Sequence, residues 1–472
     1  MLKNIKFNIF RPIIAILLVF IPLYPKFPLF NVTGTYVSIR LDDIIIAVSV
    51  LIWLIYQIKN KFPVFKIKIT RLFLVYFLAI ILSFINAFLI YQTEPTNILL
   101  LHLLRRFEYM SLFFIGIDSL KSVKDFRFLY IFFLISTALV SLYGYGQKYF
   151  QFPIISTMNS EFSKGQLLQM NIWTRISSTF AGHYDLAAFM SVALIIILGV
   201  ALIEKNIFIK IISFLIWLPS YQILTLTASR VSIFAFFGGA VITLFFLKKY
   251  WWILPVTILV VFSIFNSDDL NQRLIATIPA LKNQFLPSQV TNQPNTPTPT
   301  PIILQTTPTP IIVSGSIIKT TPTPTIIRHQ AEEYPAVDAD VGVARSGEIR
   351  FNAEWPRATN AWRKNSLVGS GLGSITLATD NDYLRCLGES GLLGLITFGS
   401  IFIFFIIKTI PLFFNKKPTT YNLLSIIFFG SLLSMLANAI FIDVFEASKT
   451  AYPFWIMMAF YYQSLTLPNE KT

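Results

Sequence analysis

Cysteine, histidine and charged residues are all scarce in this chain. A single cysteine, Cys386, in 472 residues excludes an internal disulfide framework and any site built from several thiolates. The three histidines, His102, His183 and His329, make a zinc site built from imidazoles a poor expectation. Only 13% of the residues are charged, whereas 55% are hydrophobic and 15% aromatic. This composition excludes an ordinary soluble globular protein.

Long apolar stretches take the place of the missing polar residues, and the mean hydropathy is +0.66. A hydrocarbon core of about 30 Å needs roughly 20 mostly apolar residues per helix. By this criterion, helical spans are predicted near 12–29, 42–58, 71–92, 97–117, 127–147, 184–203, 207–226, 229–247, 250–266, 389–412, 421–441 and 450–465. The sequence therefore predicts an all-α integral membrane protein with about twelve transmembrane helices.

The net charge is +15, and the basic residues that produce it are concentrated in alternate predicted loops. If the N-terminus is cytoplasmic, the inside loops carry clusters of basic residues: Lys59, Lys61, Lys66, Lys68 and Arg71; Lys121, Lys124 and Arg127; Lys205 and Lys210; Lys248 and Lys249; Lys416 and Lys417. This is the pattern of the positive-inside rule, so the charge indicates topology rather than a nucleic-acid partner. Both termini are predicted to be cytoplasmic. The N-terminal basic and apolar pattern lacks a small-residue cleavage motif, which predicts an uncleaved first helix.

One large loop interrupts the series of spans. Residues 1–266 contain predicted helices 1–9, residues 267–388 form an extracytoplasmic loop, and residues 389–472 contain helices 10–12. Within the loop, Thr-Pro clusters occupy much of 287–325, where repeated proline favours an extended linker without a core. The remaining part, 342–388, is richer in Arg, Glu, Trp, Asn and Gly. We expect function to reside in this second part.

The first candidate element of the loop is an amphipathic lid. Its apolar residues recur at spacings of four, three and four, which is one face of a helix: Phe351, Trp355, Ala358 and Trp362. Arg350, Glu354 and Arg357 share an adjacent face, where they either meet lipid headgroups or line the mouth of a site. Pro356 must kink this helix or lie in its first turn, which would leave Arg350 just ahead of it.

Two further patterns follow the lid. Gly369, Gly371 and Gly373 form either a plain turn or a backbone cradle for phosphate, although no strand precedes them. The polar run 380–382 lies directly ahead of an apolar span. At least one member is expected to cap that helix, and a carboxylate at the membrane surface is also a candidate general base.

Charged residues beside other spans offer ligands for an anion. Arg230 lies at the predicted outer mouth of a span, where it either snorkels to the headgroups or fixes a phosphate group. His183 and Asp185 open another span, with Asp185 expected to cap it. Arg105, Arg106 and Glu108 interrupt the fourth apolar stretch, and charges at such depth usually face a bundle interior or a partner, here Arg105 with Glu108.

Four of these patches, taken in order, resemble the O-antigen ligase and O-antigen polymerase superfamily of bacterial membrane glycosyltransferases. Residues 175–188 resemble its Gly-Thr-Phe-x-His-x-Asn-x-x-Ala segment, with one extra residue before His183 and with Asp185 in place of the usual asparagine. Residues 227–230, Thr-Ala-Ser-Arg, resemble its Thr-x-Ser-Arg. Residues 350–373 resemble its arginine and Trp-bearing loop helix, and residues 381–391 its Asn-x-Tyr-Leu-x-x-x-x-Glu-x-Gly motif.

The resemblance implies a GT-C-like fold and a metal-independent transfer of a glycan from undecaprenyl pyrophosphate. By this match, Arg230 and Arg350 clamp the lipid pyrophosphate, and Asp380 stands where the family has a histidine that assists the acceptor hydroxyl. Residues expected to contact substrate are Arg175, His183, Asp185, Trp355, Arg357 and Asn381. Two Asp-x-Asp pairs, at 338–340 and 380–382, are weak candidates for a metal, so no cofactor is expected.

The predicted setting is the outer face of a bacterial plasma membrane, with an acceptor glycan or glycolipid as the second substrate. The sequence does not separate a ligase from a polymerase. A transporter or flippase for the same lipid-linked glycan is the alternative from another class. Transporters tend to be built from inverted repeats with broken helices in matching halves, and no such repeat is visible.

Overall fold

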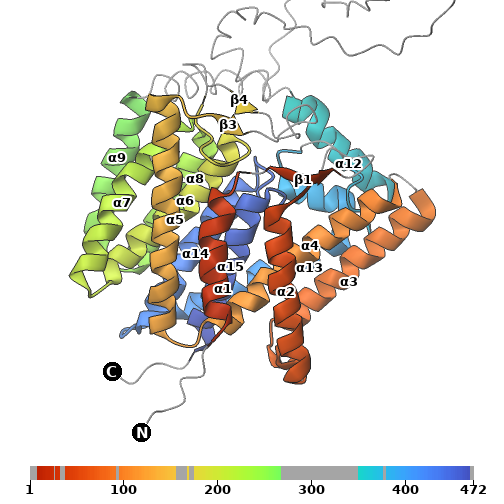
Figure 1. The fold of residues 1–472 in the computed structure, drawn as a ribbon, viewed down its shortest axis with the longest axis horizontal. Helices are drawn as coiled ribbons and strands as arrows, with labels where there is room; N and C mark the ends of the chain where they lie inside the picture. The colour runs from red at the N-terminus through yellow and green to blue at the C-terminus, as the bar shows by residue number, and fades with distance from the viewer. Residues whose placement is uncertain are drawn as a thin grey trace, which may run out of the picture.

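The computed structural model describes residues 8–25, 27–31, 38–91, 95–155, 167–168, 175–266, 349–375 and 379–467. The predicted linker at 287–325 and the Asp-x-Asp pair at 338–340 lie outside these residues. The described part of the chain is mostly helical (Figure 1). Its longer helices are α1 (Phe10–Leu23), α2 (Leu41–Lys59), α3 (Thr70–Asn86), α4 (Thr96–Ser119), α5 (Val123–Phe150), α6 (His183–Ile203), α7 (Ile207–Leu226), α8 (Arg230–Phe246), α9 (Ile253–Asn266), α12 (Trp355–Lys364), α13 (Asp382–Phe413), α14 (Thr420–Asn438) and α15 (Ser448–Thr466).

A helix lies at each of the predicted spans, with some different bounds. The first was predicted to reach residue 29, but α1 ends at Leu23 because Tyr24 precedes Pro25 and takes an extended conformation, as residues before proline do. The tenth was predicted to begin near 389, but α13 begins at Asp382. Two short hairpins were not predicted: β1 (Pro28–Asn31) with β2 (Ser38–Arg40), and β3 (Ile154–Ile155) with β4 (Leu167–Leu168).

Membrane insertion is supported by helix length and composition. Among the described residues, seven helical segments are long and apolar enough to cross a membrane: 41–59, 70–90, 123–150, 183–203, 207–226, 382–413 and 420–438. Three more, α1, α8 and 250–266, are apolar but shorter. The chain is therefore a polytopic helical membrane protein, and the number of twelve crossings stays a prediction.

The centre of the bundle is formed by α6, α14 and α15, which bury residues around most of their circumference. Polar side chains join them to α8: Asn438 donates to Ser191 Oγ at 3.0 Å and accepts from Ser232 Oγ at 2.7 Å. Such interhelical hydrogen bonds fix helix register in an apolar environment. Because Ser232 lies in the first turn of α8, they also fix the position of the adjoining Arg230.

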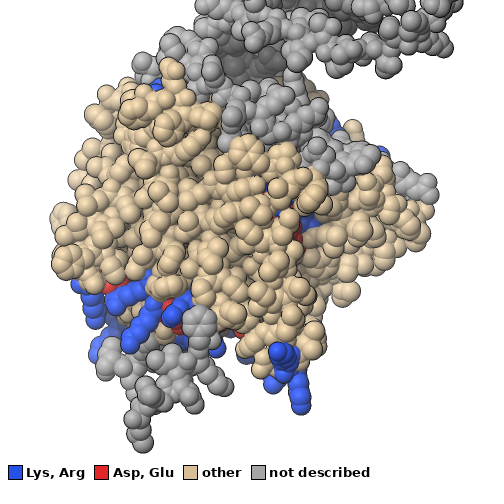
Figure 2. Space-filling model, viewed as in Figure 1, with Lys and Arg blue, Asp and Glu red and all other residues tan. Residues whose placement is uncertain are grey.

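Basic side chains gather at one end of the molecule in the view of Figure 2, and α12 lies at the opposite end (Figures 1 and 2). The loop between α2 and α3, rich in lysine, belongs to the basic end. This segregation is what a positive-inside topology produces. The cytoplasmic location of that end remains a prediction.

Candidate functional site

The polar run ahead of α13 divides into three separate roles. Asn381 is the N-cap, and its Oδ1 accepts the amide of Leu384 at 2.9 Å. The buried Asp382 accepts the amide of Phe445 at 3.2 Å. Asp380 has a left-handed φ of 49°, and its carboxylate pairs with Arg350. The predicted helix cap is thus confirmed, and it is Asn381. Asp380 does not cap the helix, so its carboxylate is a candidate for a chemical role.

Arg350 holds Asp380 through two hydrogen bonds to one oxygen. Its Nε and Nη2 lie 3.0 and 2.8 Å from Asp380 Oδ2. Arg350 belongs to a π-helical turn, η5 (Arg350–Glu354), just ahead of α12, while Pro356 lies in the first turn of α12. The prediction that Arg350 precedes the lid helix is therefore confirmed.

Two further arginines, Arg175 and Arg230, come from distant parts of the sequence and lie near Arg350 of this pair. Arg350 makes a side-chain hydrogen bond with Tyr184, and Arg230 is near enough to Arg350, Arg175 and Tyr184 to interact with them electrostatically. Arg175 Nη1 lies 2.8 Å from Nε2 of His183. Clustered cations repel one another, so a bound anion would relieve the repulsion. Such an anion would also accept paired hydrogen bonds from the guanidinium groups.

The starts of two helices bring these residues together. Helix α8 begins at Arg230 with Ser229 as N-cap, whose Oγ accepts the amide of Ser232. Helix α6 begins at His183 with Gly182 as N-cap. The expectation that Asp185 caps α6 is wrong: it lies in the first turn, where an acidic residue still interacts favourably with the helix dipole. Tyr184, between the two residues singled out in the sequence, is the one that reaches Arg350.

Glu354 is a second carboxyl at this site. The sequence predicted its place on the polar face of the lid but indicated no chemical role. Its pKa is raised to about 7, first by burial and then by nearby Asp380, against the opposing effect of Arg350. Burial also raises the pKa of Asp380, where Arg350 acts in the opposite direction and Asp443 adds to the rise. Carboxyls with raised pKa values are better proton acceptors near neutral pH than ordinary ones. Both are therefore candidate bases.

Asp443 holds the backbone on both sides of Asp380. It lies between α14 and α15, and its oxygens accept the amides of Thr379 at 2.8 Å and Asn381 at 3.1 Å. Its Oδ2 also lies 3.2 Å from Nη1 of Arg385. These bonds compensate for the unfavourable φ of Asp380. No sequence pattern marks Asp443, which is flanked by Ile442 and Val444 in an apolar stretch.

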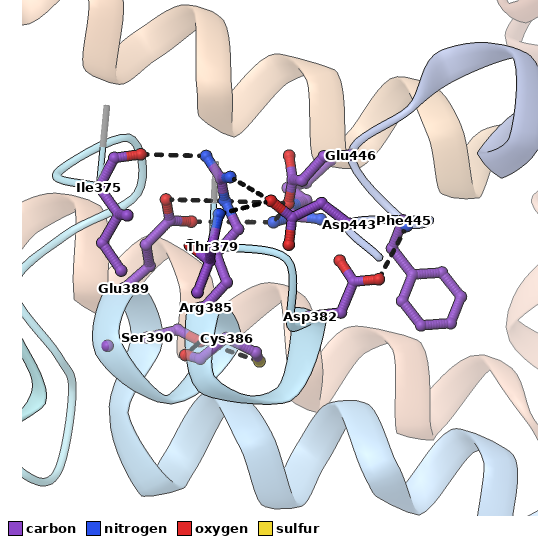
Figure 3. Close-up of polar contacts among 12 residues, drawn as sticks. Ile375, Thr379, Asp382, Arg385, Cys386, Glu389, Ser390, Asp443, Phe445 and Glu446 are labelled. Carbon is purple, nitrogen blue, oxygen red and sulfur yellow. Dashed lines mark hydrogen bonds and ion pairs between the residues drawn. The ribbon is translucent and has the colours of Figure 1, made fainter. Parts of the chain in front are cut away.

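A buried ion network lies behind Asp443 (Figure 3). Arg385 contacts Glu389 at 3.4 Å and Glu446 at 3.7 Å, and Arg106 pairs with Glu446 and lies 3.8 Å from Glu389. Arg106 of α4 thus faces the bundle interior, as expected, whereas the pairing of Arg105 with Glu108 stays a prediction. Glu108 contributes to the electrostatic environment of Arg105, but less than Tyr109 and Asp43 do.

The glycine-rich segment joins the lid to α13 instead of cradling a phosphate with the amides of Ser370 and Gly371. Gly391 breaks α13 with φ 66° and ψ −168°, which frees backbone groups on both sides of the break. The amides of Ser370 and Gly371 donate to the carbonyls of Gly388 and Glu389 at 3.0 and 2.9 Å. In return, Leu392 and Leu393 donate to the carbonyls of residues 366 and 367 at 3.0 Å. The lid is therefore fixed to the helix that follows Asp380.

The structure places the remaining predicted substrate residues around the lid. Trp355 packs edge-to-face on Phe351 with ring centroids 4.5 Å apart and lies 6.3 Å from the ring of Phe441. Arg357 faces a polar cavity described below. Asn381 uses its side-chain oxygen for the cap. Ala358 and Ala361 form the buried face of α12, with the Ala358 carbonyl close to Gly388 of α13.

No protein-family model matches the chain, and no curated protein matches it significantly.

Proposed function

We propose that the chain is an O-antigen ligase-like glycosyltransferase, which moves a glycan from undecaprenyl pyrophosphate to an acceptor sugar or lipid at the outer face of a bacterial plasma membrane. The observation that carries the proposal is the convergence of Arg175, Arg230 and Arg350 beside Asp380. The resemblance of four sequence patches to that superfamily supports it independently.

The proposed chemistry needs an anion clamp and a base. Asp380 accepts the proton of the acceptor hydroxyl, the acceptor oxygen attacks the anomeric carbon, and the bond from that carbon to the pyrophosphate oxygen breaks. The electron pair leaves on undecaprenyl pyrophosphate, whose growing charge is stabilised by Arg230 and Arg350. Fixed cations aimed at developing charge are among the largest contributions to catalysis. A ligase and a polymerase would share this step and differ only in the acceptor.

The arrangement favours chemistry at the surface over transport. The arginines lie beside the carboxylate of Asp380, whose backbone has an unfavourable φ and is held on both sides by Asp443. A flippase would also need the anion clamp, but glycan transfer in addition needs a proton acceptor placed beside that clamp, as Asp380 is.

The test is transfer by the purified full-length chain in lipid nanodiscs, with a defined undecaprenyl-pyrophosphate-linked oligosaccharide and candidate acceptors. Arg230→Ala and Arg350→Ala are each expected to lower kcat/KM by about 100-fold or more. Arg363→Ala, an exposed arginine of α12, is the matched control and should keep the parental rate. Parental rates in both clamp variants would disprove the assignment. Movement of intact donor across the bilayer of proteoliposomes that contain the chain, without transfer, would establish the transporter instead.

A further inference from the structure

A polar cavity lies on the lid, and the arginine cluster is not part of it. It has a volume of about 410 Å³ and lies between η5, α12 and the glycine-rich segment. Its lining residues are Asn352, Ala353, Pro356, Arg357, Asn360, Ala361, Lys364, Ser370, Ser374 and Ile375. A cavity of this size falls within the range of small-molecule sites.

The lining has the chemistry of a site for an acidic sugar. Asn352, Asn360 and Ser374 offer amide and hydroxyl groups to sugar hydroxyls. Arg357 and Lys364 bring two positive charges, and no acidic residue is among the described residues that line the cavity. Glu354, which interacts electrostatically with Arg357, lies outside the lining. Ala353, Pro356 and Ile375 supply small apolar surfaces for the C–H face of a sugar ring.

Arg357 supplies a second, independent observation. Its Nη1 is buried and has no hydrogen-bond partner among the described atoms. A buried donor without a partner costs free energy, and a guanidinium has the planar fork that matches a carboxylate. An anionic sugar substituent in the cavity would satisfy that donor.

We infer that this cavity binds an acidic sugar residue, of the uronic acid class, in the glycan that the chain transfers or receives. The inference rests on the proposed function only in making that sugar part of the substrate. Arg350 and Asn352 belong to the same helical turn, η5, so the cavity adjoins the arginine cluster across that turn.

The test is binding rather than turnover. Trigalacturonate and neutral galactotriose are titrated by microscale thermophoresis into the full-length chain in phosphatidylcholine nanodiscs. Trigalacturonate is expected to bind about tenfold more tightly, a difference of about 1.4 kcal/mol. Arg357→Met and Lys364→Met should each remove most of that preference, Arg357→Lys should keep part of it, and Arg363→Met, whose side chain does not line the cavity, should not change it.

Equal affinity for the two saccharides would overturn the inference. So would unchanged affinity in correctly assembled Arg357→Met and Lys364→Met variants. Loss of trigalacturonate binding when phosphatidylglycerol is added would also overturn it, because it would identify a lipid-headgroup site. Monodisperse gel filtration and parental thermal unfolding establish correct assembly. A chain that binds trigalacturonate but transfers no glycan would overturn the proposed function and leave this inference standing.

Discussion

Arg350 and Asp380 form an ion pair in which both guanidinium hydrogen bonds go to a single carboxylate oxygen, at 2.8 and 3.0 Å. The arginine proposed to bind the donor pyrophosphate is therefore also the counter-ion of the proposed base. Donor and base compete for one guanidinium, and a pyrophosphate that draws Arg350 toward itself would raise the proton affinity of Asp380. Donor binding and base activation are thereby coupled through one side chain.

Substitution of Asp380 tests whether it is the base. Asp380→Asn removes the proton acceptor at nearly the same size and is expected to lower kcat by about 100-fold or more. Asp380→His restores an acceptor and should retain much of the activity. The measurement is the transfer rate at saturating donor. Loss in both variants would point to a structural role in pairing with Arg350, and no loss in either would leave Asp380 outside the chemistry.

Glu354→Gln separates the two candidate bases. If Asp380 is the base, loss of the Glu354 charge should lower kcat by less than about tenfold, because Glu354 then acts only as a neighbouring charge. A loss in Glu354→Gln as large as that in Asp380→Asn would transfer the role of base to Glu354, whose pKa of about 7 suits it.

The pH dependence of transfer has a direction fixed by the surroundings of Asp380. Because burial and Asp443 raise its pKa, the acidic limb of the kcat profile should lie above the value of about 3.9 typical of a free aspartate. Asp443→Asn removes a negative charge that favours protonation of Asp380, so its pKa falls and the limb moves to lower pH. A purely structural role of Asp443 would lower the rate equally at all pH values and leave the limb in place.

The sequence predicted the helices well and the site only in part. Apolar length alone located the helices, because each must satisfy its backbone hydrogen bonds internally and bury apolar side chains. Arg230, Arg350 and Asp380 were identified because they are polar residues beside apolar stretches or match a family motif. Asp443 and Tyr184 were not, since their contacts join segments 58 or more positions apart, as Asp443 with Arg385 shows. The break at Gly391 escaped notice because a glycine in an apolar helix is usually tolerated.

The buried ion network is expected to be essential to folding. Arg106→Met leaves Glu446 and Glu389 without one of their positive neighbours in the bundle interior, and breaking a buried pair costs about 3–5 kcal/mol. Thermal unfolding in detergent should show a large decrease in the midpoint. Arg127→Met is the matched control: its pair with Glu204 has an arginine that is 43% exposed, and such pairs contribute about 0–1 kcal/mol. Equal decreases in the two variants would show that the network adds no more than a surface pair.

The break in α13 at Gly391 should be indispensable for holding the lid. A Cβ at this position would collide with the carbonyl of Leu367. The φ of 66° with ψ −168° also costs a residue with a side chain about 1–3 kcal/mol by itself. Gly391→Ala is therefore expected to destabilise the fold and to release the amides of Ser370 and Gly371, which would exchange faster with deuterium. Gly399→Ala, in the same helix, meets no atom within 4 Å and should be neutral or stabilising, because alanine favours helix over glycine by about 0.8–1 kcal/mol. If the two variants exchange equally slowly across 365–375, the lid is held by contacts other than its hydrogen bonds to the broken helix.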